Sequence, residues 1–270
     1  MPDKQPVDPA ILINAFNLPP EKAIEYLKSK GYAFSWDWQD IYQEAQAKSF
    51  TVAKAMREDI LNDIRAEVEK AIKDGTTLND FKKTLEPTLK AKGWWGKMPA
   101  KDVPGFNPAT GGDPNAIVQL GSPYRLKTIY NTNIQTAYMA GRERGMEEVR
   151  DARPWWMYIA VMDSRTRPSH AAMNGKIFRW NDPFWDKFYP PNDWGCRCRV
   201  VSVSGSEMQR DGLESEYSTG KIKTKEVVSN EKTGELATVS TYRDPKTGGR
   251  ITTGPGWDYN PGRASWKKAS

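Results

Sequence analysis

Hydrophobic residues in the first half of the chain recur every three or four positions, which is the spacing of one buried helix face. Polar and charged residues fill the positions between them, so each segment has two unlike sides. The predicted helices run from Pro19 or Pro20 to Lys30, from Trp38 to Asp74, from Thr77 onward and from Tyr124 to about Val149. Pro87 falls inside the third of these helices, where a proline breaks or kinks the backbone.

The pattern changes after Pro154. An apolar run over 156–162 predicts a buried strand, and 197–203 alternates between apolar and polar residues as a strand does. Farther along, 226–229 and 236–241 predict a hairpin with its turn around Thr233 and Gly234. The fold class we expect is α+β, with a helical N-terminal half followed by a smaller β-containing module and a loop-rich C-terminal tail.

The same pattern suggests how the chain is organised. Many glycines and prolines with little periodicity predict a linker or loop over 93–123. We therefore divide the chain into an N-terminal helical region at 1–92, this Gly/Pro-rich segment, a module at 124–203, and a hairpin with a C-terminal tail at 204–270.

Composition narrows the class of protein. The 11 Trp, 11 Tyr and 8 Phe favour a folded chain, because disordered chains are poor in aromatic residues. The 40 basic and 34 acidic residues leave a net charge of +6, a dispersed excess that permits weak attraction to DNA without requiring it. The sequence has no long apolar run and no secretory start, so we expect no membrane segment and synthesis in a reducing cytoplasm.

The candidate chemistry lies in one window, from Asp163 to Arg199, which holds the single histidine and both cysteines of the chain. Cys196 and Cys198 are two residues apart, so in an extended strand both side chains point to one face. His170 as a third ligand and Asp163 as a fourth would complete a tetrahedral zinc site. Structural zinc sites mostly use cysteines separated by two residues, however, and this spacing is shorter.

Three other interpretations of the window remain open. His170 could activate one of the thiols as a nucleophile, although no oxyanion loop surrounds either cysteine. A disulfide between the two cysteines would close a small, strained ring. Alternatively, both cysteines are small buried hydrophobic residues beside a hydrogen-bonded histidine, the interpretation that the spacing favours.

The order of residues in this window is distinctive. Asp-x-Arg-Thr-x-x-x-His at 163–170 is followed by Asn174-Gly175 and then by Pro-Pro-Asn-x-x-x-Cys-Arg-Cys-Arg at 190–199. This order resembles the phage Mu protein F-like family of head morphogenesis proteins, as do RLKTIYNTNIQTAYMAGR at 125–142 and GWDYNPG at 256–262. One departure is Asn174, where an acidic residue is equally common. The resemblance covers most of the chain. It implies that the module at 124–203 is the head morphogenesis module of the family.

The resemblance implies a minor capsid protein of a tailed phage or prophage, without catalytic activity, that acts in procapsid assembly near the portal. Its implied partners are portal, capsid and scaffold proteins and, weakly, packaged DNA, and its implied location is the host cytoplasm during assembly and then the virion head. No cofactor is implied besides the candidate zinc. The alternatives are a hydrolase or nucleotide-modifying enzyme that uses His170, Cys196 and Cys198, or a weakly DNA-binding head protein.

Overall fold

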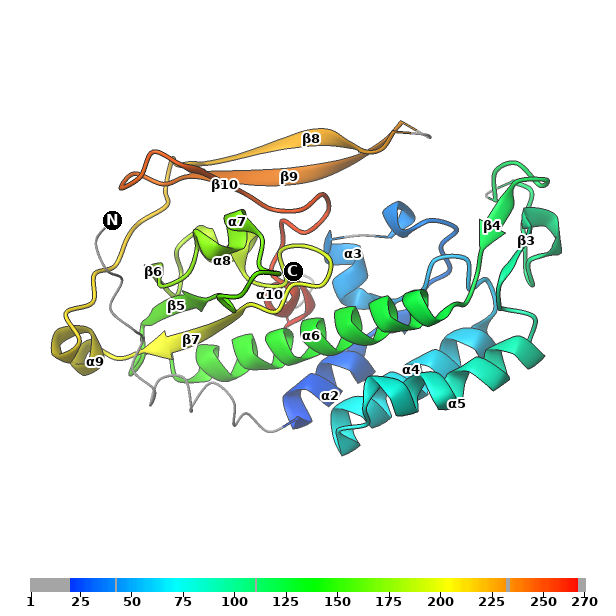
Figure 1. Cartoon of the computed structure of the whole chain (residues 1–270). Helices are drawn as coiled ribbons and strands as arrows, with labels where there is room; N and C mark the ends of the chain where they lie inside the picture. Colours follow the sequence, from blue (N-terminus) through cyan, green and yellow to red (C-terminus); the bar gives the residue numbers. More distant parts are fainter. Residues whose placement is uncertain (1–19, 42, 110, 232–233, 267–270) are drawn as a thin grey trace.

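The computed structural model describes residues 20–41, 43–109, 111–231 and 234–266. Its first half is helical and its second half holds two small sheets, which confirms the α+β class (Figure 1). The longer helices of the first half are α2 (Glu21–Ser29), α4 (Glu58–Asp74), α5 (Leu78–Ala91) and α6 (Pro123–Glu148).

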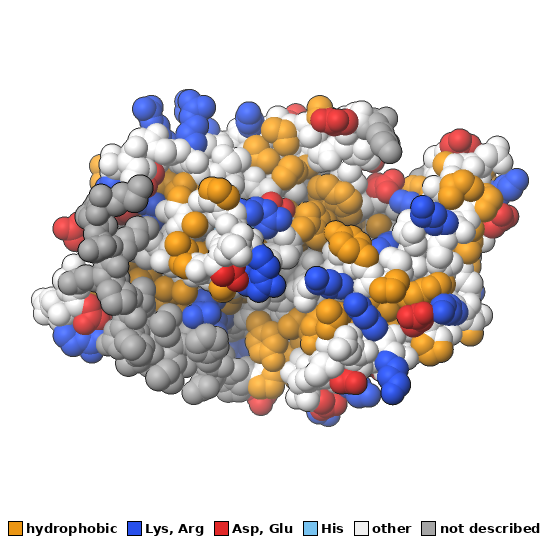
Figure 2. Space-filling model, viewed as in Figure 1, with side chains coloured by type: hydrophobic (Ala, Val, Ile, Leu, Met, Phe, Trp, Pro, Cys, Tyr) orange, Lys and Arg blue, Asp and Glu red, His pale blue; other side chains and the backbone are white. Residues whose placement is uncertain are grey.

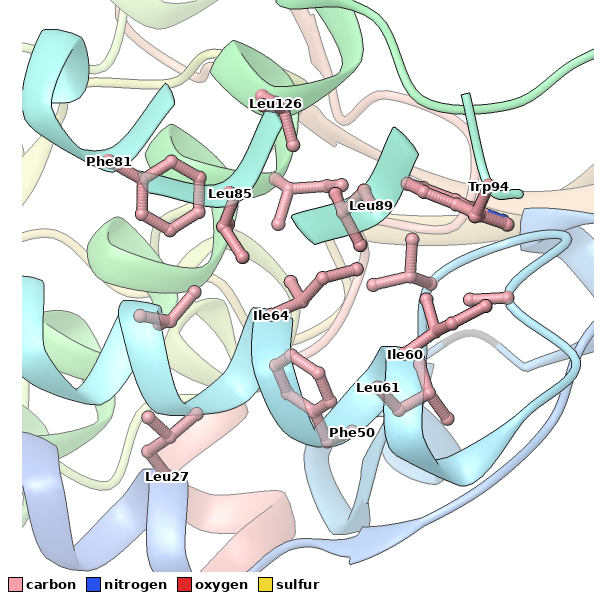
Figure 3. Close-up of a cluster of buried hydrophobic side chains, with 14 of the residues drawn as sticks. Leu27, Phe50, Ile60, Leu61, Ile64, Phe81, Leu85, Leu89, Trp94 and Leu126 are labelled. Atoms are coloured by element: carbon pink, nitrogen blue, oxygen red, sulfur yellow. The ribbon is translucent and has the colours of Figure 1, made fainter. Parts of the chain in front are cut away.

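The helices form where the apolar period predicted them and end at recognisable residues. Gly75 adopts a left-handed conformation with φ of 68° and ends α4. Thr77 caps α5 by accepting a hydrogen bond from the backbone N–H of Asp80. Their apolar faces meet in one core, whose largest members include Phe50, Ile64, Phe81, Leu85, Trp94 and Leu126 (Figure 3).

Three details differ from the sequence-based expectation. The segment 38–74 is not one helix, because Ser49–Phe50 (β2) leaves the helical path to pair with Gly31–Tyr32 (β1) in a parallel ladder. The helical pieces before β2 are η1 (Trp38–Asp40) and α3 (Gln43–Lys48). Pro87 lies inside α5 without ending it, on the exposed face, where water can satisfy the carbonyl that lacks a helical donor.

The third difference concerns 93–123. Lys97–Pro99 (β3) and Ile117–Gln119 (β4) pair as an antiparallel ladder, joined by a chain that includes η2 (Ala100–Asp102). Trp94 and Leu120 from this segment are fully buried in the helical core. The segment therefore packs as part of the helical half and does more than link it to the rest.

The β-containing half is built around Trp155–Ile159 (β5), which lies between Ile177–Arg179 (β6) and Arg199–Val203 (β7) in an antiparallel sheet. A second sheet has the order β10 (Arg250–Thr252), β9 (Glu235–Arg243), β8 (Ile222–Asn230). The β8–β9 pair is the predicted hairpin, with longer strands than expected; residue 233 of its turn lies outside the described residues. Short helices complete this half: α7 (Pro168–Ala171), α8 (Phe184–Phe188), α9 (Gly205–Arg210) and α10 (Pro261–Trp266).

Helix α6 joins the two halves. It runs from the helical core at its N-terminal end to the side of the β5–β7 sheet at its C-terminal end (Figure 1). Leu126 and Ile129 belong to the first core, whereas Met139 and Met146 belong to the aromatic core beside the sheet. The C-terminal segment packs back onto this frame, since α10 contacts both α6 and α3. None of the described helices is long and apolar enough to cross a bilayer.

Candidate functional site

Helix α7 presents His170 to the core. A turn precedes the helix, in which the backbone N–H of Arg165 donates to the Asp163 carboxylate at 3.0 Å and the N–H of Thr166 donates to the Asp163 carbonyl at 3.0 Å. Pro168 then occupies the first helical turn, where its missing N–H costs nothing. His170 lies in the last turn of this short helix and is buried, only 2% exposed.

The cysteines come from the segment that leads into β7. Gly195 adopts φ of 68°, a left-handed conformation that favours glycine, and the N–H of Cys196 donates to the carbonyl of Asp193 at 3.1 Å. The tight turn brings Cys196 and Cys198 under α7, with both thiols buried and free of any disulfide.

Three of the four predicted ligands therefore meet. The ligand atoms of His170, Cys196 and Cys198 all lie within 4.8 Å of one another, and Cys198 Sγ is 3.6 Å from His170 Nδ1. The other imidazole nitrogen, Nε2, is buried and has no hydrogen-bond partner among the described residues. We call these three residues the His–Cys cluster.

Asp163 lies outside the His–Cys cluster and has another partner. Arg197 Nη1 donates to Asp163 Oδ2 at 2.7 Å and Arg197 Nη2 donates to Oδ1 at 2.6 Å, a bidentate pair. The Arg197 guanidinium holds the pKa of that carboxyl well below its usual range. The strand expected over 197–203 begins only at Arg199, so the cysteines precede β7; Arg197, between them, is partly exposed whereas both cysteines are buried. The pair thus ties the turn before α7 to the cysteine segment from the outside.

Burial and hydrogen bonding set the state of the thiols. Burial raises the pKa of Cys196, and the hydrogen bond that Cys196 donates lowers the pKa of Cys198. A catalytic thiol must reach its substrate, whereas Cys196 is 5% and Cys198 is 2% exposed. Both thiols are therefore closed off from solvent.

The sequence-based reasoning missed Tyr158, the polar neighbour of both thiols. Its hydroxyl interacts with Cys196 and Cys198 and donates to Asn192 Oδ1 at 2.8 Å, while burial raises its pKa well above the usual value. Strand alternation could have indicated it, because Trp156 and Tyr158 share the side of β5 that packs in the same core as the cysteines.

The surface carries a groove with an aromatic lining. A groove of about 310 Å³ opens between the N-terminal end of α6 and the segment from η1 to Lys54. Its apolar lining includes Trp38, Ile129, Trp194 and the largely exposed Tyr124. Between the β8–β9 hairpin and α6, Figure 2 shows a gathering of hydrophobic side chains on this face of the molecule. We call the groove lined by Trp38, Tyr124, Ile129 and Trp194 the aromatic groove.

Comparison with known proteins identifies the class to which this helical and β-sheet architecture belongs. The family model described as Phage Mu protein F like protein matches residues 62–201, from α4 to β7, a range that includes the whole His–Cys cluster. The chain belongs to this phage Mu protein F-like family, as the resemblance of its motifs predicted.

Two relatives are similar along most of the chain. It is 43% identical over 258 residues to the protein named "Putative capsid assembly protein F" of Escherichia phage Mu, which covers 94% of this chain and 57% of that protein. It is 44% identical over 234 residues to the Mu-like prophage FluMu F protein of Haemophilus influenzae, covering 86% of this chain and 54% of the relative. The chain thus spans little more than half the length of either relative. No solved structure matches it significantly.

Proposed function

We propose that this chain is a capsid assembly protein of a tailed phage or prophage, which acts without catalysis as a minor component of the procapsid near the portal. The observation that carries the proposal is the 43% identity, over 94% of the chain, with a protein named for capsid assembly. In this proposal the protein is made in the host cytoplasm and ends in the virion head.

The proposed partners are portal, capsid and scaffold proteins, and the aromatic groove supports a protein partner. Aromatic residues and arginine are enriched at the centres of protein interfaces. The groove offers Trp38, Tyr124 and Trp194 as aromatic surface. Arg125 lies at its wall with its guanidinium fixed by the carbonyls of Gln119 and Ala53 at 2.8 and 2.6 Å. We propose the portal protein as the occupant of this groove.

The burial of the His–Cys cluster supports a non-catalytic role. An active site must admit its substrate, and these three side chains are closed off by the aromatic core beside the sheet. Contact with packaged DNA is a weaker part of the proposal, because the net charge of +6 is small for a chain of 270 residues.

Co-purification tests the proposal directly. The tagged chain is produced together with the portal and major capsid proteins of its own phage genome, and the retained proteins are measured. We expect the portal protein to be retained, and Tyr124→Ala to weaken binding at least about tenfold, the cost typical of an interface hot spot. Tyr217→Ala is the matched control, because Tyr217 is also largely exposed and lies outside the groove.

Two results would contradict the proposal. A wild-type chain that retains neither portal nor capsid protein has no role in head assembly of the proposed kind. Equal loss of binding in Tyr124→Ala and Tyr217→Ala would remove the aromatic groove as the contact surface.

A further inference from the structure

We infer that His170, Cys196 and Cys198 bind a zinc ion that cross-links helix α7 to the segment preceding β7. This inference goes beyond the proposed function and does not depend on it. It rests on three observations: the distances within the His–Cys cluster, the polar groups that burial leaves poorly satisfied, and the chemistry of the donor set.

The distances are compatible with those between ligands on a tetrahedral zinc ion. With Zn–S near 2.3 Å and Zn–N near 2.0–2.1 Å, tetrahedral geometry separates a sulfur and a nitrogen ligand by about 3.6 Å, and two sulfur ligands by about 3.8 Å. The separation of Cys198 Sγ and His170 Nδ1 is 3.6 Å, and all three ligand atoms lie within 4.8 Å of one another. The cluster can therefore accept the ion without rearrangement of the backbone.

Without a metal, the buried imidazole of His170 lacks strong hydrogen-bond partners in the described part of the chain. Buried polar groups are normally hydrogen-bonded, and a thiol is only a weak donor and acceptor. The partner of His170 Nδ1 is such a thiol, and Nε2 has none among the described residues. A metal bond to Nδ1 would replace this weak contact with a strong interaction and would compensate for burying the ring.

The donor set selects the kind of ion. Two thiolates with one imidazole suit zinc, whereas calcium and magnesium require oxygen ligands. Three protein ligands leave the fourth tetrahedral position to a non-protein ligand such as water. The hydroxyl of Tyr158, which interacts with both cysteines, is the polar group available to hold that ligand.

The consequence is a structural cross-link. The ion would join residues 28 positions apart, from Cys198 back to His170, across the antiparallel β5–β7 pair. The Asp163–Arg197 ion pair joins the same two segments on the outer side. The ion pair and the cluster therefore have different roles: Asp163 and Arg197 connect the two segments by hydrogen bonds, and the His–Cys cluster holds the metal.

The test is the metal content of the full chain. The protein is purified without chelator and its zinc is measured by mass spectrometry; we expect about one ion per chain. Loss of a second-shell partner costs 10–100-fold in metal affinity, so Cys196→Ser, Cys198→Ser and His170→Asn should each lose more than about 100-fold. Asp163→Asn is the matched control and should bind zinc as the wild type does.

A second readout covers variants that fail to fold. Wild-type protein stripped of metal is titrated with cobalt(II), which should produce the near-ultraviolet absorption of thiolate-to-cobalt charge transfer. Zinc should displace the cobalt and abolish this absorption. The inference is overturned if folded wild-type protein contains no zinc and takes up neither ion. It is also overturned if folded Cys196→Ser, Cys198→Ser and His170→Asn retain zinc as the wild type does. Neither readout involves capsid assembly. Failure of the zinc inference is therefore distinguishable from failure of the proposed function.

Discussion

Gly141 and Gly145 lie four residues apart on α6, and replacing each by alanine should have opposite effects on stability. A methyl group on Gly141 would lie 2.8 Å from the backbone nitrogen of Ala23 and 2.9 Å from the carbonyl carbon of Lys22, both on α2. A methyl group on Gly145 would meet only the flexible ammonium of Lys22, at 3.6 Å. The close approach of α2 to α6 thus depends on one of the two glycines.

The magnitudes follow from two competing terms. Alanine is favoured over glycine inside a helix by about 1 kcal/mol, and both variants gain this term. Only Gly141→Ala also suffers overpacking, which costs typically about 1–3 kcal/mol and falls at the upper end where backbone is the obstacle. We therefore expect Gly145→Ala to stabilise the fold by up to about 1 kcal/mol and Gly141→Ala to destabilise it by about 1–2 kcal/mol.

Thermal unfolding followed by circular dichroism measures the difference. Each kcal/mol shifts the midpoint by roughly 2–4 °C in a domain of this size, so the two variants should differ by several degrees with the wild type between them. Equal midpoints, or a more stable Gly141→Ala, would refute the close packing of α2 against α6.

Three further outcomes are expected. Burial raises the pKa of Glu143 from 4.5 to about 7, so the folded state binds an extra proton between these values and stability falls as the pH rises through this window. Between pH 4.5 and 7, urea unfolding should show a loss of about 3 kcal/mol in the wild type, and Glu143→Gln should lack most of this loss. Asp258→Ala should cost about 2–4 kcal/mol in the same assay, because the fully buried carboxylate accepts from Ser240 at 3.0 Å and from Gln43 at 2.6 Å. Cys196 and Cys198 should react with a thiol reagent in native buffer far more slowly than in urea, since both are buried; rapid native labelling would contradict their placement.

The sequence predicted the elements whose signals are local. Helices α4, α5 and α6 follow from an apolar period that each segment carries within itself, and their caps lie within a few residues. The break at 49–57 could not be predicted in this way, because Ala53 and Met56 fit the helical period. The competing interaction is the pairing of β2 with β1, whose partner residues lie 18 positions earlier in the chain.

The candidate site, too, was predictable only in part. The meeting of His170 with the two cysteines was predictable, because they are the only residues of their kinds and lie in one window. The partner of Asp163 was not, since the sequence does not show whether a carboxylate turns toward a thiol cluster or toward an arginine 34 residues away. In the structure the arginine offers two charge-assisted hydrogen bonds, and the carboxylate is held there.

The protein content of procapsids tests the central claim most directly. Procapsids are purified from cells that assemble heads of the corresponding phage, with and without its portal protein, and this chain is quantified by mass spectrometry. If it is a portal-associated assembly protein, it will be present in small, constant amounts and will be lost when the portal protein is absent. Its absence from normal procapsids, or an amount unaffected by removal of the portal protein, would contradict the account.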